Sequence, residues 1–253
     1  GDKTSRYEEI AQHIKRNCLG AAAKDSVFVD FNYFDRGIRN LMDGKWYPLV
    51  QMEWVRGKTM FSWLTDHCES NNKSKLTKAT DDWTRLIKQL KGHDVAHGDL
   101  QHNNIMFNSA DELKLVDYDG MCVPRLAGLD TLEYGVEPYQ HPDRNSKTKL
   151  TTSLDDFSSI FIYVGLYALA QNPSLWKSFV LDTDYEKLLF RKLITDEKGP
   201  FNDIILILLF PQSIKHNSKI KVLNRDSKTR MLIRVINQNN YMIKPFYGSQ
   251  QLQ

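Results

Sequence analysis

The chain has 253 residues, 41% of them hydrophobic and 26% charged, and a formal net charge of +3 at pH 7. This ordinary globular composition excludes a collagen-like, a coiled-coil or a wholly disordered chain. The small net charge provides no strong field, so we expect neither a nucleic acid nor a membrane as a partner. The three cysteines are widely separated, which favours a reducing compartment and a cytoplasmic location over a disulfide framework or a zinc site.

The N-terminal part of the chain predicts one helix and two strands. Tyr7, Ile10 and Ile14 recur at spacings of three and four within 5–16, which is typical of an amphipathic helix. A segment rich in β-branched and aromatic residues, a turn region and a second such segment follow, over 26–34, 37–44 and 47–55. The composition of the first and third of these segments predicts strands.

The remainder of the chain predicts mostly helices around a short hairpin. In chain order the elements are a helix, two short strands, a long polar loop and two further helices, over 82–90, 105–107, 113–116, 130–150, 154–169 and 176–193. The helix over 154–169 is the most apolar, and we expect its inward side chains to be Phe157, Ile160, Phe161, Val164 and Leu166 or Tyr167. This order of elements predicts an α+β fold with a helical C-terminal bulk.

Three polar residues flank the predicted short hairpin. Asp99 and Asn104 lie in the loop before it, and Asp117 follows its second strand. If the three converge, they supply a base and two oxygen ligands of the kind that Mg²⁺ takes, together with waters and substrate phosphates. Phosphoryl transfer needs little more from a protein than positioning, a metal and a base near the nucleophile.

The surrounding residues resemble the protein kinase-like superfamily. His97-Gly-Asp-Leu-Gln-His-Asn-Asn104 is similar to the catalytic loop H-R-D-L-x-x-x-N, and Asp117-Tyr-Asp119 resembles the D-F-G triplet. The resemblance implies that Asp99 is the catalytic base and that Asn104 and Asp117 are the magnesium ligands. It also implies that His97 supports the loop structurally.

A second group of residues resembles the nucleotide-binding part of the same superfamily. The segment 49–55 is similar to the strand and hinge that line the adenine pocket of this superfamily. By this resemblance Met52 is the gatekeeper, and the Glu53 carbonyl and the Val55 amide hold adenine. Met106 forms the floor of the pocket, and ATP is the implied cosubstrate.

Two later segments fit the same family. The segment 139–143 resembles a variant of the A-P-E motif, and 154–158 resembles the start of the central buried helix. The resemblance implies that the Asp155 carboxylate accepts backbone N–H bonds from the catalytic loop near His97. The wider pattern most resembles a bacterial branch of eukaryotic-like Ser/Thr kinases.

The chain also departs from the family pattern. Neither a Gly-rich loop nor a strand with the ATP-binding Lys precedes the helix over 5–16, so we expect the natural chain to be longer. We expect a kinase-like α+β fold with a truncated N-lobe over 1–55 and a helical C-lobe over 56–253. Within the motifs, Gly98 and Asp119 stand where the family has an Arg and a Gly.

Two classes of function remain open at this point. The first is ATP- and magnesium-dependent phosphoryl transfer to a Ser or Thr of a protein substrate by the parent protein, with weak ATP binding and negligible transfer by this chain alone. The second is a pseudokinase that serves as a scaffold or nucleotide sensor for a signalling partner. A metal-hydrolase cluster of His97, Asp99 and His102 is a weaker alternative, because no second His/Asp cluster completes it. An exposed, truncated N-lobe also predicts self-association.

Overall fold

The structure of the protein is a computed structural model. It describes residues 3–17, 19–20, 26–141, 144–181 and 188–189, all within one compact unit that spans residues 1–195. The predicted helix over 176–193 is described only in part, and most of the predicted C-lobe after residue 189 lies outside the described residues. None of the helices in the described part combines the length and hydrophobicity needed to cross a bilayer.

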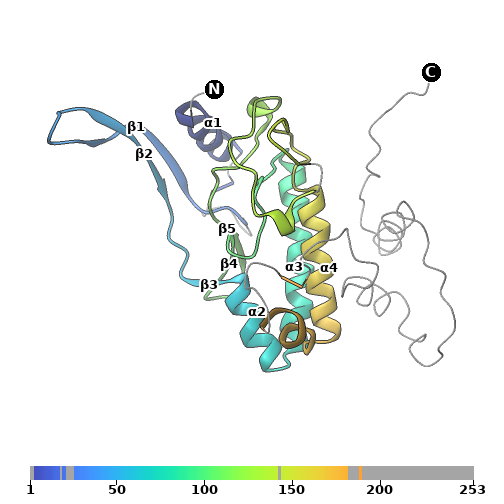
Figure 1. The fold of residues 1–253 in the computed structure, drawn as a ribbon. Helices are drawn as coiled ribbons and strands as arrows, with labels where there is room; N and C mark the ends of the chain where they lie inside the picture. Colours follow the sequence, from blue (N-terminus) through green and yellow to red (C-terminus); the bar gives the residue numbers. More distant parts are fainter. Residues whose placement is uncertain (1–2, 18, 21–25, 142–143, 182–187, 190–253) are drawn as a thin grey trace, which may run out of the picture. The chain divides into compact units, whose positions relative to one another are not determined.

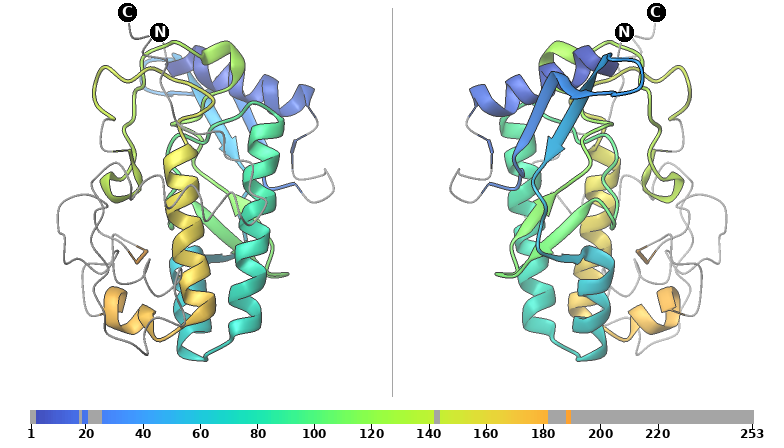
Figure 2. Two further views of the ribbon diagram at one scale, coloured as in Figure 1. Left: turned by 90° about the vertical axis from the view of Figure 1, so that its right-hand side faces the viewer. Right: turned by 90° about the vertical axis from the view of Figure 1, so that its left-hand side faces the viewer.

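The described elements confirm the α+β class. In chain order they are α1 Lys3–Arg16, β1 Phe31–Arg39, β2 Trp46–Met52, β3 Gly57–Thr59, α2 Met60–Glu69, α3 Lys73–Gly92, β4 Ile105–Asn108, β5 Leu113–Leu115, the 3₁₀ turns η1 Pro124–Leu126 and η2 Glu137–Tyr139, α4 Asp156–Gln171 and the π-helical turn η3 Lys177–Leu181. The long helices α3 and α4 lie side by side, and α1 lies beside the β1–β2 hairpin (Figures 1 and 2).

The strands form two small antiparallel sheets. β1 pairs with β2 in a register that joins Phe31 to Met52, and an irregularity interrupts the pairing between Phe34 and Ile38. The predicted turn over 37–44 is therefore wrong at its start, because β1 continues to Arg39. The second sheet has the order β3-β4-β5, and its last two strands are the predicted short hairpin.

The N-terminal predictions are confirmed with shifted boundaries. Ile10 and Ile14 are buried on one face of α1, whereas Tyr7 is only half-buried. The start of the predicted strand over 26–34 instead forms an isolated bridge, in which buried Phe28 pairs with Leu115 of β5. This bridge ties the segment before β1 to the second sheet.

Helix α4 is buried as predicted, but on a partly different face. Phe161, Val164 and Leu166 are buried, whereas Phe157 and Ile160 are half-buried and Tyr167 is 36% exposed. Helix α3 packs against α4, and the contact includes the small residue Ser159, whose carbonyl accepts the indole N–H of Trp83 at 3.0 Å. A helix that is apolar on nearly all sides does not indicate its buried face by periodicity.

The two described cysteines are buried free thiols. Cys68 lies in α2 and Cys122 follows the second sheet. Burial raises the pKa of Cys68 to about 12 and that of Cys122 to about 11. Both are therefore protonated and unreactive at neutral pH. Cys18 lies outside the described residues.

Candidate active site

The loop between α3 and β4 brings Asp99 and Asn104 into contact. The Asn104 side-chain amide donates to the Asp99 backbone carbonyl and to Asp99 Oδ2, each at 3.0 Å. Asn104 is buried and Asp99 is half-buried at the surface of this loop. Because the amide nitrogen is used in this way, Oδ1 is the Asn104 atom suited to bind a cation.

Asp117 lies next to this pair because β5 ends beside the loop. The Val116 N–H donates to the Asn104 carbonyl at 3.0 Å, and Asp117 follows with φ of +66°. Aspartate tolerates this left-handed conformation better than most residues. The Asp117 side chain is exposed, but partial desolvation by the atoms around it raises its pKa, and the negative charges of Asp119 and Asp99 raise it further, while His97 opposes them. The backbone contact between Val116 and Asn104 is what brings Asp117 to the part of the loop that holds Asp99.

A buried carboxylate holds the start of the loop between α3 and β4 by hydrogen bonds. The buried Asp155, directly before α4, accepts hydrogen bonds from the N–H groups of His97 and Gly98, the second at 2.8 Å. The predicted contact between Asp155 and the loop is therefore confirmed. Burial raises the pKa of Asp155, and His97 and the two backbone N–H groups act in the opposite direction.

Two observations explain why residue 98 is a glycine. Its φ is +80°, and a Cβ built there would overlap the Gly120 carbonyl oxygen. The antiparallel bridge between Ala96 and Cys122 brings these two backbone segments together. The family's Arg cannot be accommodated here without moving one of the two segments.

His97 uses both ring nitrogens within the protein. Nε2 lies 2.9 Å from the Val116 carbonyl oxygen, and Nδ1 accepts the Asp99 N–H at 3.4 Å. The ring also contacts Tyr118 edge-on. These contacts favour a supporting histidine over a metal ligand. Among the described residues, no group of three or more His, Cys, Asp and Glu side chains is arranged to hold a metal ion.

The middle residue of the Asp117-Tyr-Asp119 triplet is fixed by hydrogen bonds that sequence reasoning missed. The buried Tyr118 hydroxyl accepts from the Val29 N–H at 2.9 Å and donates to the Leu115 carbonyl at 3.0 Å. Asp119 forms a side-chain hydrogen bond with Tyr7 of α1, and burial together with this carboxylate raises the pKa of Tyr7. The triplet is thus held by α1 and by the segment directly before β1.

Of the predicted adenine-binding residues, Met52 is the one that contacts a predicted metal ligand, Asp117. The Asp117 N–H donates to Met52 Sδ at 3.5 Å. Met106 is half-buried in β4, opposite Thr59 and Lys114. The Glu53 N–H and side chain are both bonded to the Asp30 backbone. Val55 is half-buried between β2 and β3.

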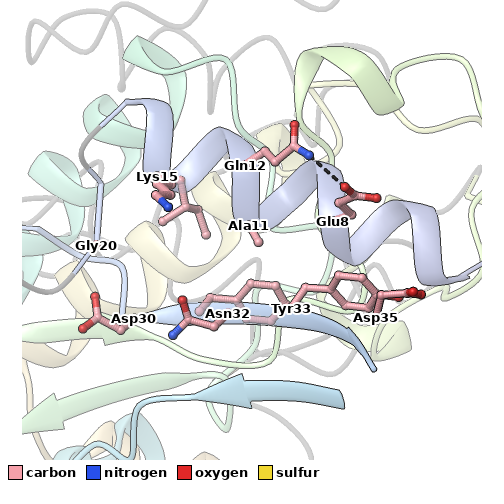
Figure 3. A pocket seen from close by; sticks show the side chains of 11 residues that line it. Glu8, Ala11, Gln12, Lys15, Gly20, Asp30, Asn32, Tyr33 and Asp35 are labelled. Carbon is pink, nitrogen blue, oxygen red and sulfur yellow. Dashed lines mark hydrogen bonds between the residues drawn. The ribbon is translucent and has the colours of Figure 1, made fainter. Parts of the chain in front are cut away.

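A cavity of about 830 Å³ lies elsewhere, between α1 and β1 (Figure 3). Its polar lining includes Glu8, Gln12, Lys15, Asp30 and Asn32. Glu8 and Gln12 are joined by a hydrogen bond of 3.0 Å across one turn of α1. The predicted residues Met52, Val55 and Met106 do not line this cavity, so it is not the predicted adenine site.

The long loop before α4 contributes contacts that the motifs did not indicate. The Val136 N–H donates to Asp99 Oδ1 at 3.0 Å. Tyr139 is fully buried, with its hydroxyl against His102 Nδ1. The last two residues of the predicted A-P-E-like motif, Pro142 and Asp143, lie outside the described residues. The glycine at position 135 was the one sequence signal for a close backbone approach here.

Comparison with protein-family models and with curated proteins finds no match for this chain. The functional argument therefore depends on the geometry of the loop and on the motifs that it contains.

Proposed function

We propose that this chain carries the phosphoryl-transfer site of a protein kinase-like enzyme, which moves the γ-phosphate of ATP to a Ser or Thr of a protein substrate. The observation that carries this proposal is the contact of Asn104 with Asp99 in a loop that buried Asp155 anchors, beside the end of β5, where the Val116 N–H donates to the Asn104 carbonyl and Asp117 follows. The proposed fold is correspondingly kinase-like, with a helical C-lobe and a truncated N-lobe.

The proposed roles follow from the atoms that each residue offers. Asp99 accepts a hydrogen bond from the Ser or Thr hydroxyl of the substrate and orients it, since it is the half-exposed carboxylate of the loop. Asn104 Oδ1 and the Asp117 carboxylate are hard oxygen ligands, which fit Mg²⁺ with waters and phosphate oxygens completing its coordination. When bound, Mg²⁺ neutralises the negative charge of the phosphates.

For ATP, the proposal assigns the adenine side of the site to the segment after β2. Met52 contacts the Asp117 backbone, so the proposed adenine and metal sides are adjacent. The Glu53 carbonyl and the Val55 amide would bind the adenine edge, and Met106 would lie beneath the ring.

A pseudokinase remains the second candidate, and one observation favours it. Both Asp99 oxygens already accept hydrogen bonds, from Val136 and from Asn104. A site held in this way could serve a scaffold or nucleotide sensor that docks on a signalling partner without transferring phosphate. The two candidates share magnesium-dependent ATP binding and differ in phosphoryl transfer.

The shared step is tested with Asp117→Asn. We expect the wild-type chain to bind ATP weakly with Mg²⁺ and more weakly with a chelator. Replacing the carboxylate removes a charge-assisted contact worth roughly 1.5–3 kcal/mol, so ATP affinity in Mg²⁺ should fall about tenfold or more. Isothermal titration calorimetry measures this affinity. Asp130→Asn, an exposed carboxylate that pairs with Lys149, is the control and should bind as the wild type does. Equal affinity of the wild type and Asp117→Asn would contradict the proposed metal site.

We also propose that a second copy of the chain covers the exposed face of the β1–β2 hairpin. Phe34, Ile38, Tyr47 and Leu49 are 41% to 56% exposed, and their cross-strand pairing places them on one side. This side lies opposite the one on which Phe31 contacts Tyr7 of α1. The hairpin carries charges of both signs, so a second copy is not repelled. The charged residues are Asp35, Arg36, Arg39, Asp43 and Lys45.

Sedimentation velocity at increasing protein concentration tests this self-association. The wild type should shift toward a dimer, because burial of apolar surface drives association. Leu49→Lys should remain monomeric, since it places a charge in the centre of the contact. A wild-type protein that is monomeric at all concentrations would contradict the proposal.

A further inference from the structure

The guanidinium of Arg144 joins the loop before α4 to the catalytic loop. Nη1 donates to the Gly98 carbonyl at 2.7 Å and also to the Gln140 side chain. Nη2 donates to the Glu133 carbonyl at 3.0 Å. A planar guanidinium can serve several acceptors at fixed angles, which a lysine ammonium does less well. Arg144 therefore connects both ends of the segment 133–140 to the residue that precedes Asp99.

The same segment reaches the proposed base through its backbone. The Val136 N–H donates to Asp99 Oδ1, while Asn104 donates to Oδ2, so two donors fix the plane of the carboxylate from opposite sides. Each carboxylate oxygen has a further lone pair with which it can accept a substrate hydroxyl. Gly135, with φ of +70°, permits this approach, since a Cβ there would lie 2.6 Å from Asp99 Oδ1.

The Gly98 peptide region is thus held from two directions. Asp155 accepts its N–H at 2.8 Å, and Arg144 donates to its carbonyl. Gly98 has no side chain that could hold the neighbouring segment. The contact is made instead by the guanidinium of Arg144, 46 positions later in the chain. Burial lowers the pKa of Arg144, while the charges of Asp155 and Asp99 support its charged form.

We propose that Arg144 is a positioning residue for phosphoryl transfer. It holds the segment 133–140 against the catalytic loop, so that the Val136 N–H keeps the Asp99 carboxylate oriented toward the acceptor hydroxyl. This inference rests on the proposed function for its catalytic consequence, whereas the positioning of Val136 can be measured without it.

Arg144→Gln tests the positioning directly, with Arg144→Lys and Arg125→Gln as comparisons. Arg125 is an exposed arginine of the same loop region that pairs with Glu9 at 3.4 Å. Hydrogen exchange of the Val136 amide, followed by NMR in the full chain, should accelerate at least about tenfold in Arg144→Gln, because its hydrogen bond opens more often. Exchange in α3 and α4 should remain as in the wild type. Arg125→Gln should change the exchange of neither region. In Arg144→Lys, the exchange rate of the Val136 amide should lie between those of the wild type and Arg144→Gln.

Phosphoryl transfer by the natural protein supplies the second measurement. In Arg144→Gln, kcat should fall about 10²-fold, as expected for a displacement near 1 Å at the base, while MgATP affinity stays unchanged. In Gly135→Ala, kcat should fall by a similar factor. Gly128→Ala, which has φ of +86° but no atom within 4 Å of the added Cβ, reports the backbone strain alone and should retain kcat.

The outcomes separate the inference from the proposed function. Unchanged exchange at Val136 in Arg144→Gln, or a wild-type kcat in an active protein, would overturn the role of Arg144. A natural protein without phosphoryl transfer would contradict the proposed function, and the exchange result would then still decide whether Arg144 holds the segment.

Discussion

Asp155→Ala is expected to lower the free energy of unfolding by about 3–5 kcal/mol, because it leaves two buried backbone donors without a partner. The buried carboxylate accepts the N–H groups of His97 and Gly98, and alanine cannot replace either hydrogen bond. Each orphaned donor costs roughly 1–3 kcal/mol. For a unit of this size the melting temperature should fall by about 10 °C or more, as measured by calorimetry.

The adjacent carboxylate provides a matched control for this experiment. Asp156 is partly exposed and pairs with Lys91, so Asp156→Ala should cost less than about 1 kcal/mol. Asp155→Asn should be intermediate, because its amide oxygen can accept one of the two N–H groups while its amide nitrogen faces the other. If Asp155→Ala and Asp156→Ala have the same melting temperature, the anchoring of the loop between α3 and β4 by Asp155 is wrong.

Asp99→Asn is expected to reduce phosphoryl transfer by the natural protein about 10²- to 10⁴-fold, the range that a general base contributes. The asparagine oxygen can still accept the Val136 N–H, and Asn104 keeps its hydrogen bond to the backbone carbonyl of residue 99 while it loses the one to Oδ2, so the melting temperature should fall only slightly. MgATP affinity should also be retained, because Asn104 and Asp117 are untouched. Steady-state kinetics together with calorimetry of the same samples separates these effects. Asp130→Asn should retain the wild-type rate, and an Asp99→Asn protein with that rate would remove Asp99 from the mechanism.

The short-range parts of this fold could be predicted from the sequence. Helix α1, the β4–β5 hairpin and α4 follow from periodicity and composition, and the contact of Asp155 with the loop follows from the motif. Helix α2 was missed although Met60, Trp63 and Leu64 have helical spacing and are buried. That signal was present in the sequence and could have located the helix.

Contacts between distant loop residues had no comparable signal. Arg144 reaches Gly98 across 46 residues, and Val29 reaches the Tyr118 hydroxyl across 89. Neither contact belongs to a helix or strand, so neither produces a periodic pattern in the sequence. The burial of α4 was predictable, but its inward face was not, because small residues such as Ser159 and Gly165 pack inward beside the large ones. These contacts depend on tertiary packing, which local patterns do not encode.

The most direct test of the proposed site is transfer of the γ-phosphate from radiolabelled ATP to Ser and Thr of a protein substrate by the natural full-length protein. The assay is run with Mg²⁺ and with a chelator, on the wild type and on the Asp99→Asn and Asp117→Asn variants. We predict transfer that requires Mg²⁺ and is lost in both variants. Transfer that persists in Asp99→Asn, or magnesium-dependent ATP binding by the wild type without any transfer, would contradict the enzymatic proposal, and the second result would identify the protein as a nucleotide-binding module.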